Sequence, residues 1–155
     1  MDGQQQEFNE NLKAAEAGNR DAMFNLGFCY WTGNGVSQDF EKAIEWYTKA
    51  ADLGDAEAQS NLGGIYASGE AVALDYAKAI EWYTKAANQG EPHSHFMLGM
   101  FHITGDCNVQ TNEEKAIEWF TKAVNQGDPE AVKCITEGAE KGFPVFKKVY
   151  EAWKR

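Results

Sequence analysis

Apolar side chains recur along the chain with the spacing of one face of an α-helix. Positions i, i+3, i+4 and i+7 lie on one side of a helix, and three segments follow that spacing. The three sets are Met23, Leu26, Gly27, Tyr30; then Gln59, Leu62, Gly63, Tyr66; and then His95, Leu98, Gly99, His102. A second kind of segment carries small and aromatic residues on one stripe: Phe40, Ala43, Ile44, Tyr47, Ala50 and Ala51. No segment alternates with the period of two that strands show, so the pattern predicts an all-α protein.

The two kinds of segment alternate, and the pair is repeated. The Leu-Gly pair begins at Leu26, Leu62 and Leu98, 36 residues apart each time. The block Ala-Ile-Glu-Trp-aromatic-Thr-Lys-Ala begins at residues 43, 79 and 116, in steps of 36 and 37 residues. The extra residue of the third copy lies between Gly105 and Asn112. Self-similarity at this period is the signature of a stacked helical repeat.

Start and stop signals predict where the helices begin and end. Glycine breaks each first helix, and a residue with a short acceptor side chain begins each second helix: Asp39, Asp75 and Asn112. We expect first helices over 21–32, 56–68 and 92–104, and second helices over 39–53, 75–89 and 112–126. Glycine inside a helix costs about 1 kcal/mol relative to alanine. The glycine inside each first helix therefore predicts a close approach of the second helix.

Two helices of this length cannot bury both apolar faces alone, so neighbouring copies must stack. We predict a single domain over residues 1–155, a right-handed α-solenoid of three repeats with capping helices at both ends. The expected parts are a cap at 1–18, repeats at 19–54, 55–90 and 91–127, and caps at 128–155. We interpret the last helix, near 143–154, as a lid on the final repeat. The alternative is a linker or partner-binding helix from a longer parent protein.

Composition and charge narrow the classes of function. The 155 residues are 43% apolar and 25% charged, which excludes a disordered tail. A formal net charge of −10 argues against binding of nucleic acid or of anionic membranes. No apolar run approaches the about 18 residues of a membrane span, and the N-terminus lacks the basic and apolar stretches of a signal peptide. Three cysteines make no disulfide framework. We therefore expect a reducing, cytoplasmic setting, and we expect a monomer.

The repeated motif carries a resemblance to a known family. The first copy reads Ala-x-x-x-Leu-Gly-x-x-Tyr-x-x-Gly-x-Gly-Val, then Asp-x-x-Lys-Ala-x-x-Trp-Tyr-x-Lys-Ala-Ala and Gly, from Ala22 to Gly54. This pattern resembles the Sel-one-like repeat, a relative of the tetratricopeptide repeat with a longer loop. The resemblance covers residues 19 to 127, with departures at Ala71 and His102. It implies a non-enzymatic adaptor or scaffold that binds proteins, and some similar proteins are stoichiometric inhibitors.

The resemblance also implies a binding face. In related repeats the first helices line the concave side, where residues off the apolar stripe meet a protein or peptide partner. The positions that this implies are Asp21, Phe24, Asn25, Phe28 and Trp31 in the first repeat, Glu57, Ser60, Asn61 and Gly64 in the second, and His93, Phe96, Met97 and Met100 in the third. Phe24, Phe28 and Trp31 form an apolar strip that suits an extended peptide or a helix. The alternative is that these rings pack between repeats while the asparagines face water.

Histidine and cysteine gather in the third repeat and offer the one candidate for catalytic chemistry. The residues are His93, His95, His102 and Cys107. A zinc site needs a closed set of ligands, and no paired Cys-x-x-Cys or His-x-x-x-His spacing supplies one. His95 and His102 also occupy core positions of the repeat, so we favour buried histidines over a metal-dependent enzyme. No nucleophile is coupled to a base by any motif. We predict no catalytic residue, no metal and no cofactor. The alternative to an adaptor is a stoichiometric inhibitor or immunity-type protein, whose acidic charge would suit a basic target.

Overall fold

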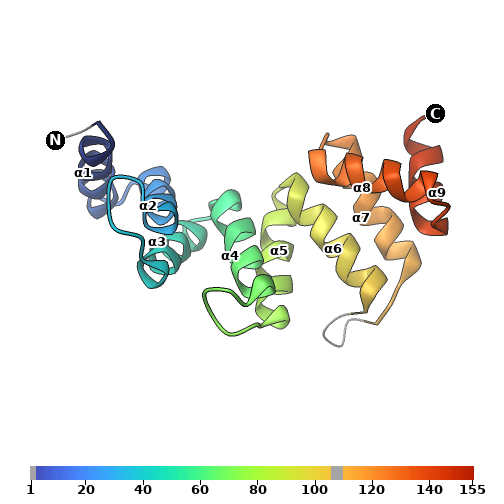
Figure 1. Cartoon of the computed structure of the whole chain (residues 1–155), viewed down its shortest axis with the longest axis horizontal. Helices are drawn as coiled ribbons and strands as arrows, with labels where there is room; N and C mark the ends of the chain where they lie inside the picture. Colours follow the sequence, from blue (N-terminus) through green and yellow to red (C-terminus); the bar gives the residue numbers. More distant parts are fainter. Residues whose placement is uncertain (1–2, 106–109) are drawn as a thin grey trace. The chain divides into compact units, whose positions relative to one another are not determined.

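The computed structural model describes residues 3–105 and 110–155, which form helices and no strand. The helices are α1 (Gly3–Glu16), α2 (Arg20–Thr32), α3 (Phe40–Asp52), α4 (Ala56–Ser68), α5 (Tyr76–Asn88), α6 (Pro92–Thr104), α7 (Glu113–Asn125), α8 (Pro129–Glu140) and α9 (Pro144–Trp153) (Figure 1). The all-α repeat fold is confirmed. Each of the six repeat helices begins and ends within one residue of its expected boundary.

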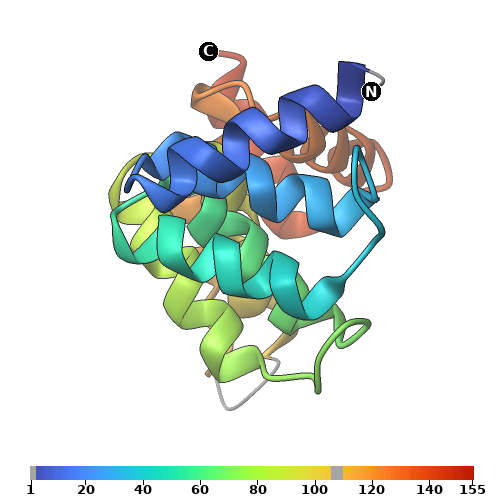
Figure 2. The ribbon, with the colours of Figure 1, turned by 90° about the vertical axis from the view of Figure 1, so that its left-hand side faces the viewer.

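The chain divides into two compact units, residues Met1–Asp75 with α1 to α4 and residues Tyr76–Arg155 with α5 to α9. In the first unit, α1, α2 and α3 lie in successive layers, as Figure 2 shows. In the second unit, α6 packs on α7, α8 contacts both α6 and α7, and α9 packs on α7 and α8. Each repeat hairpin that lies within one unit therefore packs its first helix directly on its second.

Local capping chemistry sets the ends of the helices. The side chain of Asp39 accepts a hydrogen bond from the backbone N–H of Lys42 at 3.0 Å, and Asn112 accepts one from Lys115 at 2.9 Å. Both residues are N-caps, as the sequence predicted. At the other end of α2, Gly33 takes the left-handed conformation, with φ of 77°, and its N–H bonds the carbonyl of Cys29. Glycine adopts this conformation without a Cβ clash, so it ends the first helix cleanly.

The glycine inside the first helix sits under an aromatic ring. A Cβ on Gly27 would lie 2.5 Å from Cδ1 of Tyr47, and one on Gly99 would lie 2.7 Å from Cδ1 of Phe120. The expected close approach of the second helix is confirmed for these two repeats. In α8, Thr136 stands at the position of this glycine, and Gly138, two residues further along, lies against the ring of Phe146 of α9.

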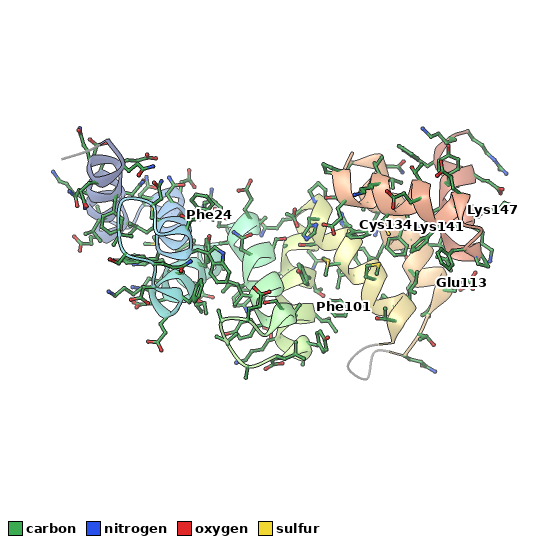
Figure 3. All side chains as sticks on the ribbon, viewed as in Figure 1. Phe24, Phe101, Glu113, Cys134, Lys141 and Lys147 are labelled. Atoms are coloured by element: carbon green, nitrogen blue, oxygen red, sulfur yellow. The ribbon has the colours of Figure 1, made fainter. Side chains whose placement is uncertain are left out.

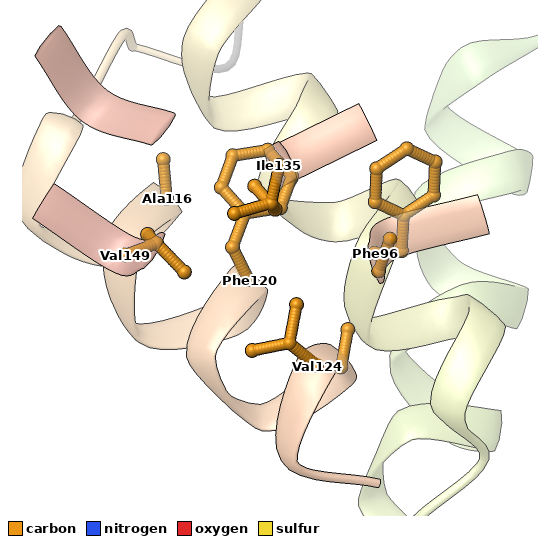
Figure 4. Packing of buried hydrophobic residues seen from close by; sticks show 8 residues of the cluster. Phe96, Ala116, Phe120, Val124, Ile135 and Val149 are labelled. Carbon is orange, nitrogen blue, oxygen red and sulfur yellow. The ribbon is translucent and has the colours of Figure 1, made fainter. Parts of the chain in front are cut away.

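Apolar side chains of both units are buried in clusters that include the capping helices. In the first unit, Phe8 of α1 and Leu26 of α2 share a cluster, and the Phe8 ring meets Tyr30 edge-on at 5.5 Å. In the second unit, Phe120 of α7 is surrounded by Ile135 of α8 and Val149 of α9 (Figure 4). Val149 is fully buried. The apolar face of α9 therefore packs on α7 and α8.

Candidate functional site

The residues proposed for partner binding lie on three helices and differ in exposure. Those on α2 and α4 belong to the first unit, and those on α6 belong to the second. Five are exposed: Asp21, Asn25, Phe28, Glu57 and Asn61. Six are half-buried: Phe24, Trp31, Gly64, His93, Met97 and Met100. The remaining two, Ser60 and Phe96, are buried.

Two exposed phenylalanines and one half-buried tryptophan lie where α2 ends and α3 begins. Phe28 is 49% exposed, and Trp31 lies one helical turn further along α2, so their side chains are neighbours. The Trp31 ring meets the ring of Phe40 with centroids 4.7 Å apart. We call Phe28, Trp31 and Phe40 the aromatic patch. Phe40 is 39% exposed, although its sequence spacing places it on the apolar stripe of the second helix.

Phe24 starts the predicted apolar strip but does not share the exposure of Phe28. Its ring, labelled in Figure 3, lies 5.7 Å from that of Tyr47 in α3. The alternative from the sequence is packing of these rings between repeats; the Phe24 ring instead contacts α3 of its own repeat. Burial raises the pKa of Tyr47 to about 12, so the hydroxyl stays neutral and keeps its hydrogen-bonding role.

Asn25 and Asn61 bond to the second helix that precedes each of them. The Nδ2 of Asn25 donates to Oδ1 of Asn11 in α1 at 3.3 Å, and Asn61 is hydrogen-bonded to the hydroxyl of Tyr47 in α3. Asn11 stands 36 residues before Tyr47, which is the repeat length, so the two bonds are equivalent. These amides link neighbouring helices, and only their remaining hydrogen-bonding capacity faces solvent.

Ser60 and Phe96 require a correction to the expected binding set. Phe96 is 4% exposed and packs on Phe120 with ring centroids 5.8 Å apart. It belongs to the same cluster as Ala131 and Ile135 of α8. Since a first helix in a repeat array has neighbours on two sides, its buried arc is wider than one apolar stripe. Neither Phe96 nor Ser60 offers a side chain to a partner, and we leave both out of the proposed surface.

The three histidines have separate environments. Nδ1 of His95 lies 2.8 Å from Oε1 of Gln126, and the imidazole stacks on Trp119 at 5.4 Å. His93 faces carboxylates, with Nδ1 3.6 Å from Oε2 of Glu130. His102 is half-buried, and burial together with the charge of Lys115 lowers its pKa below the usual 6.5. Cys107 lies outside the described residues. Within residues 3–105 and 110–155, no three His, Cys, Asp or Glu side chains form a group that could hold a metal ion.

The structure also reveals a surface arrangement that our sequence analysis missed. In each second helix the lysine of the repeated block lies over the tryptophan ring and bonds the preceding glutamate. In α3, Nζ of Lys49 is 4.0 Å from the Trp46 ring centroid and 2.7 Å from Oε1 of Glu45. The spacing Glu-Trp-x-x-Lys places the three on neighbouring helix positions, so the signal was present in the sequence. These tryptophans are thereby covered by their own chain.

No helix in the described part of the chain has the length and apolar character needed to cross a membrane.

Comparison with known proteins identifies the repeat. A family model described as the Sel1 repeat matches residues 20–55, 56–91 and 92–128. A search of curated protein sequences finds no significant match to the chain. Among solved structures, a Sel1 repeat protein from Oxalobacter formigenes is 34% identical, with a TM-score of 0.74 over 83% of this chain and 96% of that one.

Two further solved structures share the fold. The protective antigen c5321 of uropathogenic Escherichia coli, which displays an SLR fold, is 29% identical with a TM-score of 0.80. The alignment covers 93% of this chain and 32% of that antigen, so this chain spans about a third of its length. The immunity protein Pa5087 from Pseudomonas aeruginosa is 23% identical with a TM-score of 0.50, over 94% of this chain and 72% of that one. At that identity the likeness concerns the fold alone.

Proposed function

Because this chain belongs to the Sel1 repeat family, we propose that it is a non-enzymatic adaptor that binds a protein or peptide partner through its first helices. Sel1 repeat proteins are in general scaffolds for protein–protein interaction. In this chain the proposed contact residues are those of the expected set that keep an exposed or half-buried side chain. On α2 these are Asp21, Phe24, Asn25, Phe28 and Trp31.

The observation that carries the proposal is the exposure of Phe28. An aromatic side chain that is 49% exposed on a helix whose other apolar residues are buried or half-buried gains little from folding. Removing such a ring from water on binding supplies affinity. The equivalent positions in the other repeats are Gly64 and Met100. A position that varies within an otherwise regular repeat is free of scaffold constraints and available for recognition.

The test compares two exposed phenylalanines. Phe28 and Phe143 are similarly exposed, at 49% and 54%, but lie on α2 and at the start of α9. Partners captured from a native lysate by the wild-type chain are identified by mass spectrometry and their affinities for Phe28→Ala and Phe143→Ala are measured. We expect Phe28→Ala to weaken binding by at least about tenfold and Phe143→Ala to leave it unchanged. The reverse order, or two variants that bind as the wild type does, contradicts the proposal.

A second candidate function is stoichiometric inhibition of a basic target, and the net charge of −10 favours it. The structural likeness to an immunity protein adds only the fold. An adaptor leaves the activity of an enzymatic partner unchanged, whereas an inhibitor abolishes it at one equivalent. Titration of the captured partner with the chain therefore separates the two functions.

A metal-dependent enzyme is the contrasting class. It would need the region of His93, His95 and His102 as its site, but His95 already bonds Gln126 and stacks on Trp119. We expect the purified protein to hold no stoichiometric metal, and chelators to change neither its helical content nor its partner binding. Elemental analysis that finds one zinc per chain would contradict this assignment.

A further inference from the structure

Four of the five tryptophans of the chain hold a lysine against the ring. Trp46, Trp82 and Trp119 each carry the lysine three residues further along the helix, with Nζ 4.0, 4.1 and 4.4 Å from the ring centroids. Trp153 carries Nζ of Lys154 at 4.2 Å. An ammonium group over an indole face is attracted by the negative face of the ring. The surface of this protein thus uses its tryptophans as cation sites.

Trp31 is the exception. No lysine or arginine in the described part of the chain lies over its ring, and its ring contact is with Phe40 at 4.7 Å. The side chain is half-buried, so part of the indole still faces solvent. Phe28, one turn earlier on α2, and Phe40, whose ring contacts Trp31, are 49% and 39% exposed. An indole face beside two exposed rings suits a side chain that has both a positive charge and an aliphatic stem.

The charge of the first unit matches such a guest. Residues 1–75 hold 13 Asp and Glu against 4 Lys and Arg, a net charge of −9, whereas residues 76–155 hold 11 against 10, a net charge of −1. Most of the net negative charge of the chain therefore lies in the unit that carries the aromatic patch. This asymmetry steers a positively charged partner toward the first unit.

Three of the four basic side chains of the first unit are already engaged. Lys42 pairs with Asp39 at 3.3 Å and Lys49 with Glu45 at 2.7 Å, while Arg20 bridges Asp21 and Asp55. By contrast, the carboxylate of Glu41, next to Phe40 in sequence, is exposed at the first turn of α3. Glu41 is thus an exposed carboxylate one residue away in sequence from Phe40 of the patch.

We propose that the aromatic patch of Phe28, Trp31 and Phe40 receives a lysine or arginine side chain from a basic segment of the partner protein. The inference rests on the proposed function, since it names the chemistry of the partner for that binding surface. The aliphatic stem of the guest covers Phe28 and Phe40. Its charged end lies on Trp31, as Lys49 lies on Trp46.

The test uses a phage-displayed library of random linear peptides, selected on the immobilised full-length chain. We expect the enriched peptides to share a lysine or arginine beside an apolar residue. Replacing the basic residues of the best peptide by glutamine should weaken its binding to the wild-type chain by roughly tenfold or more. This measurement needs no variant of the protein and is therefore independent of any change in folding.

Variants of Trp31 test the place of binding. Trp31→Phe keeps an aromatic face and should retain most of the affinity, whereas Trp31→Leu keeps the apolar volume and should lose roughly tenfold. Trp82→Leu removes a ring that already holds Lys85 and serves as the control that leaves peptide binding intact. Circular dichroism and a thermal melt establish that each variant is folded.

The outcomes separate this inference from the proposed function. Enriched peptides that are acidic, or that bind Trp31→Leu as they bind the wild type, overturn the inference and leave the scaffold function standing. A library that yields no binding peptide also overturns the inference, whereas the proposed function is tested by the comparison of Phe28→Ala with Phe143→Ala. A dimer of the chain alone that Trp31→Leu dissociates would make a second copy the occupant of the patch, and this result also overturns the inference.

Discussion

Gly27 and Gly99 show how one missing methyl group sets the distance between two helices. Each lies under the ring of an aromatic residue of the next helix, Tyr47 and Phe120, closer than any Cβ would allow. The free energy that glycine costs in a helix is offset by the burial of that ring, since Tyr47 and Phe120 are both almost fully buried. The recurrent Leu-Gly pair is therefore a packing device of the repeat.

The first prediction concerns this contact. Gly27→Ala should lower the free energy of unfolding by about 1–3 kcal/mol, because the new methyl group displaces the Tyr47 ring, although alanine favours the helix by about 1 kcal/mol. Gly3→Ala is the control, since nothing lies within 4 Å of a Cβ at that position. Urea denaturation measures both. Should Gly27→Ala be as stable as Gly3→Ala, the ring contact does not limit the packing.

A second prediction concerns His102. Burial, with Lys115, lowers its pKa below 6.5, so the native state binds this proton less readily than the unfolded chain does. As the pH falls through about 6.5, the unfolded chain takes up the proton first and stability decreases. The other repeats carry Tyr30 and Tyr66 at this position. His102→Tyr should therefore reduce the loss of stability between about pH 7 and pH 5.5.

Urea midpoints at the two pH values measure the effect of His102. The wild type and His102→Tyr are compared at both pH values. An equal loss in His102→Tyr and in the wild type would show that the imidazole of His102 is not the source.

At the scale of elements, the α2–α3 loop holds the N-terminal capping helix. Gly35, with φ of 70°, lies against the carbonyl of Gln4 and the side chain of Phe8, both in α1. A side chain at residue 35 would push the first turn of α1 away. Gly54 also has a positive φ, of 86°, but a Cβ there meets nothing within 4 Å. Substitution of Gly54 therefore tests the backbone conformation alone, whereas substitution of Gly35 tests the backbone conformation together with the contact to α1.

The third prediction uses that pair. Gly35→Ala and Gly54→Ala both pay about 1–2 kcal/mol for the left-handed conformation, and only Gly35→Ala also disturbs α1. We expect Gly35→Ala to be the less stable variant and its α1 amides to exchange hydrogen faster. Hydrogen exchange followed by mass spectrometry measures this. Equal exchange of α1 in the two variants would mean that Gly35 does not hold the cap.

The elements that sequence predicted well are those whose ends depend on local chemistry. Asp39 and Asn112 cap α3 and α7 within the first turn, and glycine ends each first helix, so the signal and the structure are only a few residues apart. The same capping residues and glycines belong to the repeat motif from which the sequence predicts the family. Gly27 was identified as a contact point, but the partner ring, Tyr47, could not be chosen from spacing alone.

The binding surface was harder to predict because burial depends on neighbours that are distant in sequence. Phe96 lies off the Leu98 stripe and is predicted to face a partner, yet it is buried in one cluster with Ile135 of α8. Phe40 lies on the stripe, yet it is 39% exposed, because it is the first residue of α3 and stands at the end of the helix. The partner of Asn25, Asn11, belongs to a capping helix whose sequence has lost the repeat motif.

At the scale of the whole molecule, the charge is unevenly distributed. The net charge is −9 for residues 1–75 and −1 for residues 76–155. Long-range attraction acts on the rate at which a partner arrives, and salt screens it over about 10 Å at 0.1 M. Buried aromatic anchors act instead on the rate at which the partner leaves. The two contributions can be measured separately.

The fourth prediction follows from this separation. Asp21→Lys and Glu57→Lys, both at exposed positions of the first unit, should slow association several-fold at low salt and lose that effect at high salt. Glu140→Lys changes the net charge equally but lies in the second unit, and should slow association less. Surface-based binding kinetics at both salt concentrations measure the rates. An equal effect of all three variants would show that only the total charge matters.

The central claim is that partners bind to the exposed side chains of the first helices, and hydroxyl-radical footprinting of the partner complex tests it most directly. The method measures how readily each side chain is oxidised, with and without the captured partner bound to the full chain. Our account predicts that binding protects Phe28 and Trp31 and leaves Phe143 and Trp153 as reactive as in the free protein. Protection of Phe143 and Trp153, with Phe28 and Trp31 unchanged, would contradict it.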